Sequence, residues 1–494
     1  MRTLLIVLVA LPVVLLPPAV AAQSDGLLRV VVRFTSPPTA TDLGAIRAAG
    51  GRVTARFESV PAVAASIPPG AVAAIMAGPR VARVEEDAIY TADDVVSELD
   101  WTWGVRHIGA GAVHASATTY TGRGVRVAVF DTGINYTHPD LAPNYRGGYD
   151  FVNNDGDPWD DNGHGTHVAG TIAAVRDGAG VVGVAPDVEL YALKVLGADG
   201  NGYVSTFISA LDWAVRNGIQ VTNHSYGGLA KSATFEEALA KAAALGMVHT
   251  ASAGNRGSCD GRGDSVGYPA GYRSVIAVAA TDSTDTRACF SSTGADVEAA
   301  APGVQIRSTL RTGAYGDRWN GTSMAAPHVS GTAALLLGSA PADANGNGFL
   351  HDEVRNLIAR TAVDLGTAGR DTLYGFGRVD VAAAAAAITT PVEPTCSVDS
   401  VVYASSGGKG SKDVTIGIGV VYGPVAPLPG ASLTARIEKD GQVIQHVNGV
   451  TNDNGLLAVT LKNAPSGVYT TLVTSVFSSG LNWDSHTPAN TFRK

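Results

Sequence analysis

The chain has 494 residues, 45% of them hydrophobic and 16% charged, so it can bury more than one hydrophobic core and form several domains. Its net charge of −9 argues against nucleic acid or an anionic membrane surface as a partner, and it fits a secreted protein that binds cations. The 59 glycines indicate many tight turns.

The N-terminus has the pattern of a Sec-type signal peptide, predicted at residues 1–22. Arg2 is followed by an apolar stretch from Leu4 to Leu16 and then by small residues, the usual order of charge, apolar core and cleavage site. A membrane anchor is the alternative, but this apolar run is short for a spanning helix. We therefore expect a secreted, extracellular protein with no membrane anchor after the signal is removed.

Residues 23–99 are predicted to form a small α/β domain. Hydrophobic periodicity alternates there between the spacing of strands and that of helices, and glycine or proline marks the ends. The strands are expected at 27–34, 52–57 and 81–90, and the helices at 40–51 and 68–79. The acidic stretch 91–100 lacks this periodicity, which predicts an exposed linker.

Residues 100–390 are predicted to form an α/β domain with a mostly parallel sheet covered by helices on both faces. Near-continuous apolar strands alternate with helical patterns, as in parallel sheets that are buried on both sides. The strands are expected at 124–130, 188–196, 219–228, 247–255, 274–282 and 297–303, and the helices at 205–218, 233–246 and 324–337. Functional residues of such folds lie at the carboxyl ends of the strands.

Residues 391–494 begin with a proline-containing linker and continue as a predicted all-β sandwich. Short alternating strands are separated there by Gly, Asn and Pro, with no clear helical pattern. The chain has three cysteines. Cys259 and Cys289 fall in one predicted domain, where they could pair as a disulfide, and Cys396 would then be left over.

Three polar side chains end a predicted strand or begin a predicted helix of the α/β domain: Asp131, His164 and Ser323. Each alone has a structural explanation, as a turn residue, a solvated imidazole or a helix N-cap. Together they supply a carboxylate, a base and a hydroxyl at one sheet, the set that acyl transfer requires. The base takes the hydroxyl proton, and the carboxylate orients the base and stabilises the cation that forms.

Asn255 is the last residue of a further predicted strand and lies next to Gly254. A tetrahedral intermediate needs hydrogen-bond donors aimed at its oxyanion, and a side-chain amide at this position would supply one. The alternative is an ordinary turn residue, because glycine and asparagine are common in turns.

Three sequence blocks carry the acid, the base and the hydroxyl: VAVFDTGINYTHPDL, DDNGHGTHVAGTIAA and NGTSMAAPHVSG. They resemble the signature blocks of the subtilisin-like serine proteases (the subtilase or peptidase S8 family), in the order Asp, His, Ser, and the resemblance spans about residues 103–388. It implies a serine endopeptidase that hydrolyses peptide bonds through an acyl-enzyme, with these three side chains as the triad and Asn255 in the oxyanion hole. His167 and His328 are then expected to be structural.

The resemblance also implies that a peptide substrate binds as an added β-strand between two backbone segments. The residues expected to contact it are Ser225, Tyr226, Gly227, Gly228, Ala251, Ser252, Ala253 and Gly254. Tyr226 would line a pocket for a side chain a few residues upstream of the cut. His224 departs from the apolar residue expected just before the first segment, and the sequence offers no reason for it.

Residues 23–99 resemble the inhibitory propeptide of the same family, so the chain is expected to be a zymogen whose own propeptide is an intramolecular inhibitor. Self-cleavage is then expected between residues 88 and 99. Protein and peptide substrates are the expected partners, and the enzyme is expected to be a monomer.

Calcium is the cofactor that the resemblance implies. The matching ligands are the side chains of Asp140 and Asp177 and the carbonyl groups of Val175, Ala179 and Val181. Two other segments have metal-binding features. The carboxylates of residues 150–161 either hold a cation or are solvated, and residues 343–354 resemble an EF-hand loop that has valine in place of glutamate at its last position.

Two further questions remain open on the sequence alone. The chain could be a binding or inhibitory protein on a protease-like scaffold, although its complete set of triad and oxyanion residues argues against this. Residues 396–494 could form an adhesion or substrate-docking module, or an appendage that stabilises the protein.

Overall fold

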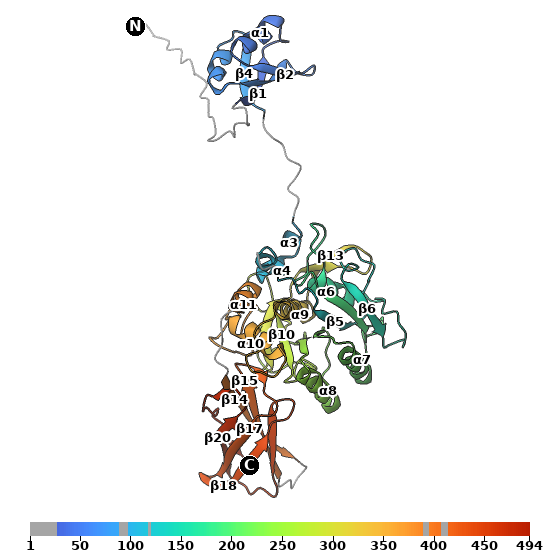
Figure 1. Ribbon diagram of the computed structural model, residues 1–494, viewed down its shortest axis with the longest axis vertical. Coiled ribbons are helices and arrows are strands. Elements are labelled where there is room, and N and C mark those ends of the chain that lie inside the picture. The colour runs from blue at the N-terminus through green and yellow to red at the C-terminus, as the bar shows by residue number, and fades with distance from the viewer. Residues whose placement is uncertain (1–26, 88–96, 117–119, 389–394, 407–412) are drawn as a thin grey trace, which may run out of the picture. The chain divides into compact units, whose positions relative to one another are not determined.

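The computed structural model describes residues 27–87, 97–116, 120–388, 395–406 and 413–494. The predicted signal peptide, most of the predicted self-cleavage window and the linker residues 389–394 lie outside the described residues. The chain divides into two compact units, residues 1–95 and 96–494, whose helices and strands are labelled in Figure 1. Within the described residues, no helix is both long and apolar enough to cross a membrane.

The first unit contains an antiparallel sheet with the strand order β2-β3-β1-β4. Its elements are β1 (Leu28–Phe34), α1 (Ala40–Ala48), β2 (Arg52–Arg56), β3 (Ala62–Ile67), a 3-10 turn (Pro69–Ala71), α2 (Val72–Met76) and β4 (Val81–Glu86). All of these except β3 form where the sequence predicts regular structure. The sequence analysis misses β3 because all of its residues are buried, so they show no alternation, and half of them are alanine.

The second unit begins with a short helix, α3 (Glu98–Trp101), inside the stretch predicted to be an exposed linker. The prediction of an exposed residue is wrong at Glu98, whose side chain is buried. Its Oε2 atom accepts a hydrogen bond of 2.9 Å from the N–H of Gly178, which accommodates the carboxylate in the interior. Gly178 is 80 residues from Glu98 along the chain, so a local sequence pattern cannot predict this hydrogen bond.

A seven-stranded parallel sheet forms the centre of the second unit, with the order β11-β10-β9-β8-β5-β7-β6 among the described strands. The strands are β5 (Arg126–Asp131), β6 (Tyr145–Asp150), β7 (Glu189–Lys194), β8 (Val221–His224), β9 (Val248–Ser252), β10 (Val275–Thr281) and β11 (Val297–Pro302). Only β6 is unpredicted: it lies at an edge, is mostly half-buried and contains two glycines. The predicted mostly parallel α/β fold is confirmed.

Helices cover both faces of this sheet, as predicted (Figure 1). On one face α9 (Thr322–Gly338) packs with α6 (His164–Ala173), and on the other lie α7 (Val204–Arg216) and α8 (Ala233–Ala244). α9 is apolar almost all round and buried along nearly its whole length, which explains why it crosses the core. The smaller elements are α4 (Trp103–His107), α5 (Ala110–His114), α10 (His351–Thr361), α11 (Val381–Ala387) and the hairpin of β12 (Ile306–Thr309) and β13 (Tyr315–Trp319).

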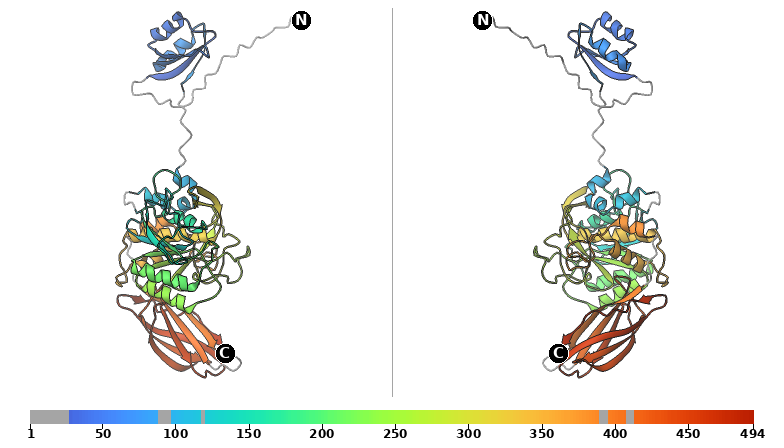
Figure 2. Two further views of the ribbon diagram at one scale, coloured as in Figure 1. Left: turned by 90° about the vertical axis from the view of Figure 1, so that its right-hand side faces the viewer. Right: turned by 90° about the vertical axis from the view of Figure 1, so that its left-hand side faces the viewer.

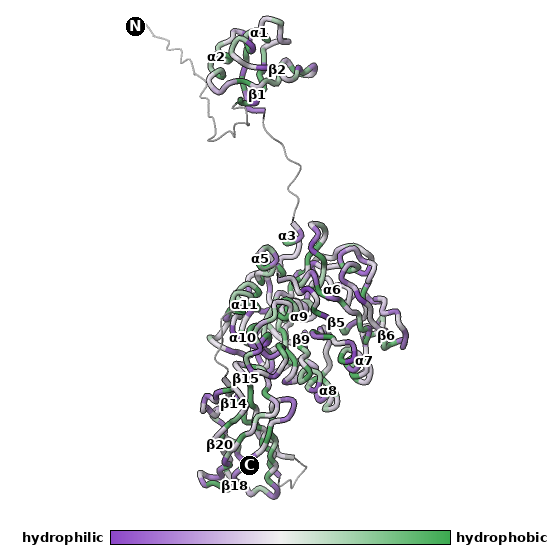
Figure 3. Tube along the Cα trace, viewed as in Figure 1, coloured by the Kyte–Doolittle hydropathy of each residue, from purple (hydrophilic) through white to green (hydrophobic). Residues whose placement is uncertain are grey.

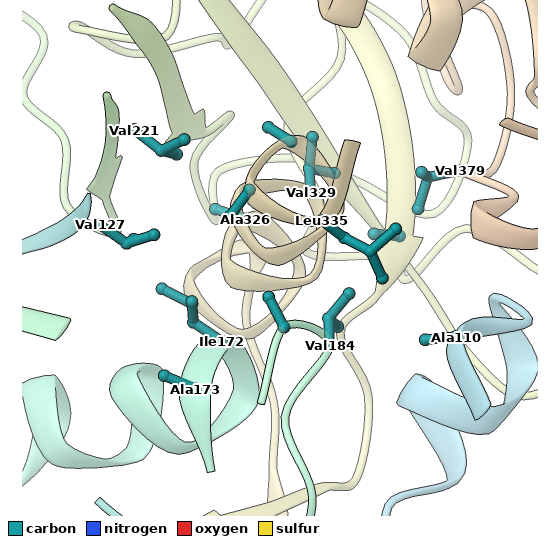
Figure 4. Packing of buried hydrophobic residues seen from close by; sticks show 14 of the residues in the cluster. Ala110, Val127, Ile172, Ala173, Val184, Val221, Ala326, Val329, Leu335 and Val379 are labelled. Carbon is teal, nitrogen blue, oxygen red and sulfur yellow. The ribbon is translucent and has the colours of Figure 1, made fainter. Parts of the chain in front are cut away.

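The core around α9 is made of small and branched aliphatic side chains (Figure 4). Ala326, Val329 and Leu335 of this helix belong to one buried cluster with Val221 of β8, Ile172 of α6 and Val184. Figure 3 shows hydrophobic residues gathered along the helix and strands at the centre of the unit, with hydrophilic residues in its outer loops. This packing holds the start of α9 in a fixed place relative to the strand ends.

Residues 395–406 and 413–494 form the predicted all-β sandwich (Figure 2). One sheet contains β14 (Thr395–Ser406), β15 (Asp413–Tyr422), β16 (Ala426–Pro427), β19 (Leu456–Leu461) and β21 (Asn482–Trp483). The other contains β17 (Ser432–Lys439), β18 (Gln442–Val450), β20 (Val468–Phe477) and β22 (Phe492–Arg493). Their inward side chains enclose a separate hydrophobic core, so the sandwich has its own source of stability.

The sandwich and the α/β part of the second unit share polar contacts. The Arg273 guanidinium donates two hydrogen bonds of 2.7 Å to the Asp399 carboxylate, and the Asn356 amide donates one of 3.0 Å to the carbonyl of Tyr422. Within the α/β part, Cys259 and Cys289 form a disulfide, and Cys396 of the sandwich is a buried free thiol. The pairing that the sequence left open is therefore present.

Candidate active site

Asp131 and His164 are joined by a direct hydrogen bond in the structure. Asp131 is the last residue of β5, and His164 is the first residue of α6. The Asp131 Oδ1 atom lies 2.7 Å from His164 Nδ1, and the Asp131 side chain has no solvent exposure. A carboxylate acceptor at Nδ1 keeps the proton on that nitrogen, so Nε2 is the atom available to act as a base.

A second buried carboxylate, Asp160, shapes the turn that presents His164. Its Oδ1 atom accepts a hydrogen bond of 2.7 Å from the Gly163 N–H, and its Oδ2 atom accepts one of 2.9 Å from the Thr166 N–H. Gly163 has a φ of 117°, a conformation that side chains with a Cβ rarely adopt. Within the acidic run 150–161, this aspartate therefore positions the turn and is not solvated.

The pKa of the His164 imidazole is raised above its ordinary value. Burial lowers this pKa, whereas the negative charge of Asp131 and the hydrogen bond to it raise it, with a further contribution from the charge of Asp160. The net direction is upward, because the charged form of the ring is stabilised more by its anion than it is penalised by burial. A base of this kind is well suited to hold a proton temporarily during a reaction.

Ser323 is the second residue of α9, and it is hydrogen-bonded to Ser225, the residue directly after β8. Its Oγ atom donates a hydrogen bond of 2.9 Å to the Ser225 carbonyl, and the Ser225 hydroxyl donates one of 2.9 Å to the Ser323 carbonyl. β8 lies beside β5, with His224 opposite Phe130, so the residues that follow these two are neighbours at the same sheet edge. The bonded pairs Asp131–His164 and Ser225–Ser323 therefore meet at the carboxyl ends of two adjacent strands.

The Ser323 hydroxyl makes no hydrogen bond to His164 among those of the described residues, because it is turned toward the Ser225 carbonyl. Rotation about its Cα–Cβ bond is the motion that would bring the Oγ atom to the imidazole. Such a loosened contact is common in proteases without substrate and tightens when a substrate binds.

Asn255, the predicted oxyanion donor, is held against the start of α9. Its Oδ1 atom accepts two hydrogen bonds of 2.9 Å from Thr322, one from the backbone N–H and one from the hydroxyl. With Oδ1 used as an acceptor, the amide nitrogen faces elsewhere, and it donates to no group in the described part of the chain. The Asn255 amide nitrogen is therefore a free donor, held beside Thr322, the residue before the candidate nucleophile.

The first predicted substrate segment, residues 225–228, has a free backbone position. The N–H and C=O groups of Gly227 make no hydrogen bond to any described residue, whereas Gly228 pairs with Tyr268 through bonds of 2.9 and 2.8 Å. An extended peptide can therefore pair with the segment only at Gly227 and nearby.

The second predicted segment, residues 251–254, lies inside the sheet. Ala251 and Ser252 belong to β9, which has β8 on one side and β10 on the other. The backbone groups of Ala253 and Gly254 are bonded to Val278, Gly267, Thr322 and Ser292. Ala253 and Gly254 therefore cannot pair with an added strand, because their backbone donors and acceptors are already occupied. The prediction that the segment 251–254 contacts the substrate stays a prediction.

Trp319, the last residue of β13, lies beside the site and is missed by the sequence analysis. Its ring centroid is 6.4 Å from that of His164 and 4.4 Å from that of His167, with which it stacks at 15°. Burial lowers the pKa of His167 to about 3, so this ring is a neutral packing partner. Trp319 is four residues before Ser323 in the sequence, a spacing that carries no chemical signal of its own.

The predicted calcium ligands offer a set of oxygen atoms at the loop after α6. Asp140 is buried, and its oxygens accept hydrogen bonds from the Tyr315 hydroxyl at 2.8 Å and the Val181 N–H at 3.0 Å. The carbonyls of Val175, Ala179 and Val181 accept no hydrogen bond from the described residues, although Val181 is fully buried. An unpaired buried carbonyl is costly, and a hard cation would satisfy it.

The pKa of the Asp140 carboxyl is raised, mainly by burial and partly by the charge of Asp177, so a cation would relieve an existing electrostatic cost. No three His, Cys, Asp or Glu side chains gather as a metal site in the described ranges. The candidate site therefore depends on carbonyl oxygens as well as carboxylates.

The sequence is similar to those of known proteins. It matches the subtilase family over residues 122–377. It is 45% identical to subtilisin E of Bacillus subtilis (strain 168) over 337 residues, which cover 68% of this chain and 84% of that protein. It is 44% identical to an alkaline protease of Shouchella clausii over 328 residues, 66% of this chain and 80% of that protein. The chain therefore belongs to the subtilase family and is a serine endopeptidase.

Proposed function

We propose that the chain is a secreted, self-processing endopeptidase that forms an acyl-enzyme on Ser323. His164 takes the Ser323 proton as the Oγ atom attacks the scissile carbonyl, and Asp131 orients the imidazole and stabilises its positive charge. The imidazolium gives this proton to the leaving amine, and water then attacks the ester with His164 again as base. The contact of 2.7 Å between a buried Asp131 and His164 is the observation that carries the proposal.

A direct experiment compares endopeptidase activity with simple binding. The purified chain is incubated with an unfolded protein substrate, and the fragments are identified by mass spectrometry, with and without a serine-directed inhibitor. We expect cleavage at internal bonds that stops with the inhibitor. A chain that has lost residues 23–99 and binds the substrate without cutting it would instead be the binding protein on a protease-like scaffold.

Replacing Asn255 with alanine is expected to lower kcat by about 10²- to 10³-fold, a range adopted from subtilisin, in which it was measured. KM should change little, because the amide contacts the oxyanion only in the transition state. Steady-state kinetics on a peptide amide measures both constants. Asn217→Ala, at the end of α7, is the control and should match the unmodified enzyme. A kcat within threefold of normal for Asn255→Ala would contradict the assignment.

We also propose that residues 23–99 form an inhibitory propeptide that is removed by self-cleavage between residues 88 and 99, and that residues 391–494 remain as the C-terminal domain. Two observations support this: the residues before 96 form a compact unit of their own, and a resemblance to the propeptide is present in their sequence. N-terminal sequencing of the active product tests the cleavage position. A mature N-terminus well outside this window would overturn it.

Calcium is proposed as a stabilising ligand of the loop that contains Asp177. When bound, the ion would supply charge neutralisation and rigidity, and it would have no part in the chemistry. At a concentration a hundredfold above its Kd, it should add about 2.7 kcal/mol of stability, or roughly 3 to 5 °C in Tm for a unit of this size. Removing it with a chelator should lower Tm by that amount, and adding calcium back should restore it.

A pair of variants locates the ion. Asp177→Ala should lose most of the calcium-dependent shift in Tm, while Asp212→Ala, an exposed aspartate on α7, should keep it. Differential scanning calorimetry with and without chelator gives the four values. An unchanged Tm of the unmodified protein after chelation, or a full shift in Asp177→Ala, would rule out this site.

A further inference from the structure

We propose that His224 is a positioning residue that fixes the Tyr226 side chain and thereby shapes the surface that residues 225–228 present to the substrate. This inference rests on the proposed function, in which that segment contacts the peptide. It also accounts for the histidine at a position where an apolar residue is expected. His224 itself is fully buried, so a bound substrate cannot contact it.

A continuous chain of hydrogen bonds leads from Tyr226 into the protein. It crosses β8 and β9 and ends at a carbonyl group of α8. Its links are Tyr226 Oη to His224 Nδ1 at 2.8 Å, His224 Nε2 to Thr222 Oγ1 at 2.9 Å, Thr222 Oγ1 to His249 Nδ1 at 2.6 Å, and His249 Nε2 to the Leu239 carbonyl at 3.1 Å. The two histidines and the threonine are buried, so water does not compete for these bonds.

The end of the chain determines the donor in every link. The Leu239 carbonyl can only accept, so His249 carries its proton on Nε2. Burial lowers the pKa of His249 to about 3, so this ring is neutral and its Nδ1 atom accepts from the Thr222 hydroxyl. The threonine oxygen in turn accepts from His224 Nε2–H.

His224 is therefore left with Nδ1 as an acceptor, provided that its ring is neutral. Burial and the nearby His249 lower the pKa of His224 well below its ordinary value, so the His224 ring is neutral. Burial also raises the pKa of the Tyr226 phenol, which keeps its proton. Tyr226 donates to His224, and each group in the chain has a single consistent role.

The bond to His224 holds Tyr226 at its inner end, and aromatic contacts hold its face. The Tyr226 ring stacks on Phe207 of α7 with centroids 4.4 Å apart and an angle of 22°, and Phe207 in turn contacts Phe235 at 5.7 Å. The residue Tyr226 as a whole is half-buried, and it directly precedes the free backbone of Gly227. A ring fixed at both its hydroxyl and its face offers a rigid apolar wall at low entropic cost.

This arrangement indicates a preference for substrates with a large apolar side chain upstream of the cut, at the position that meets the wall. Without the acceptor at 224, a buried phenol would have no hydrogen-bond partner. Its hydroxyl would then turn toward water and move the ring. The loss should appear in the affinity for extended peptides and not in the chemical step on short substrates.

The test compares His224→Leu, which removes both ring nitrogens, with His224→Asn, whose Oδ1 atom can replace the Nδ1 acceptor. His114→Leu is the matched control, because His114 is also buried and bonded to a carbonyl, that of Val184 at 2.8 Å, but it lies on α5. The substrates are a short ester, and two extended peptide amides that differ only in an upstream phenylalanine or alanine. Fluorophosphonate titration gives the fraction of active enzyme.

We expect His224→Leu to lose about three- to tenfold in kcat/KM on the phenylalanine peptide, mainly through KM, with kcat on the short ester within twofold. His224→Asn should recover most of the loss, and His114→Leu should show none. An unchanged phenylalanine-to-alanine ratio in His224→Leu, or no recovery in His224→Asn, would overturn the proposal. If His224→Leu does not fold, Tyr226→Phe, which removes the same bond from the other side, must reduce the ratio.

The experiment gives a different result if the proposed function itself is wrong. The unmodified enzyme would then neither react with the fluorophosphonate nor hydrolyse the short ester. An active enzyme whose phenylalanine-to-alanine ratio of kcat/KM does not change when residue 224 is replaced would overturn only the role of His224.

Discussion

Replacing Ser323 with alanine is expected to lower kcat by about 10⁶-fold, the size of loss measured for removal of the nucleophile from subtilisin. The acyl-enzyme cannot form without the Oγ atom, and only binding and the oxyanion donors remain to favour the reaction. Self-cleavage should stop as well, so the purified chain should still contain residues 23–99. Activity on a peptide amide and the mass of the intact protein measure the two effects.

Ser339→Ala is the matched control for this variant, because Ser339 follows the opposite end of the same helix and donates only to the carbonyl of Leu336. It should be processed and active like the unmodified enzyme. A Ser323→Ala protein that still loses its N-terminal unit when purified without contaminating proteases would contradict both the nucleophile and the self-cleavage.

Replacing Asp131 with asparagine is expected to lower kcat by about 10⁴-fold, as in other serine proteases with this triad. An amide is nearly the same size as a carboxylate, so the position of His164 should be retained. The amide can place an N–H group against Nδ1, which favours the tautomer with its proton on Nε2. That tautomer cannot take the proton of Ser323.

The same variant should change the pH dependence of the remaining activity. The reaction needs neutral His164, so kcat falls as the pH drops through the pKa of this ring. Burial lowers that pKa and the Asp131 charge and hydrogen bond raise it, with a net rise in the native enzyme. Asparagine removes the two raising effects, so the acidic limb of the kcat profile should move to lower pH. An unmoved limb would mean that Asp131 does not set the charge of His164.

The sequence predicted the parts of the fold that have strong periodicity. The strands near Val129 and Val278 are runs of apolar residues, and α9 is long and apolar, so their burial follows from composition alone. β3 was not predicted because a fully buried strand shows no alternation of apolar and polar residues. The edge strand β6 was not predicted because it contains two glycines and few buried side chains.

The candidate site was predicted where chemistry is concentrated in single residues. Asp131, His164 and Ser323 stand out because each is a reactive side chain at the end of a regular element. Contacts between distant segments were not predictable in this way. Trp319 lies beside His164 only because the hairpin of β12 and β13 folds over α6, and a local sequence pattern cannot predict this contact.

The role suggested for His224 depends on the same kind of distant contact. Its hydrogen bonds run through three different elements, and the direction of each bond follows from the carbonyl of Leu239 at the far end. A sequence shows an unexpected polar residue among apolar neighbours but not the partner that satisfies it. The backbone pairing of Ala253 and Gly254 was predicted incorrectly for a related reason, since the sequence does not show which hydrogen bonds the sheet has already used.

The most direct measurement is the identity of the residue that reacts with a fluorophosphonate. The processed enzyme is labelled, digested with a second protease and analysed by peptide mass spectrometry, beside a heat-denatured sample and the Asp131→Asn protein. A single adduct on Ser323, absent after denaturation and strongly slowed in Asp131→Asn, is the predicted result. An adduct on another serine, or none on an enzyme that has lost its N-terminal unit, would contradict the proposed triad.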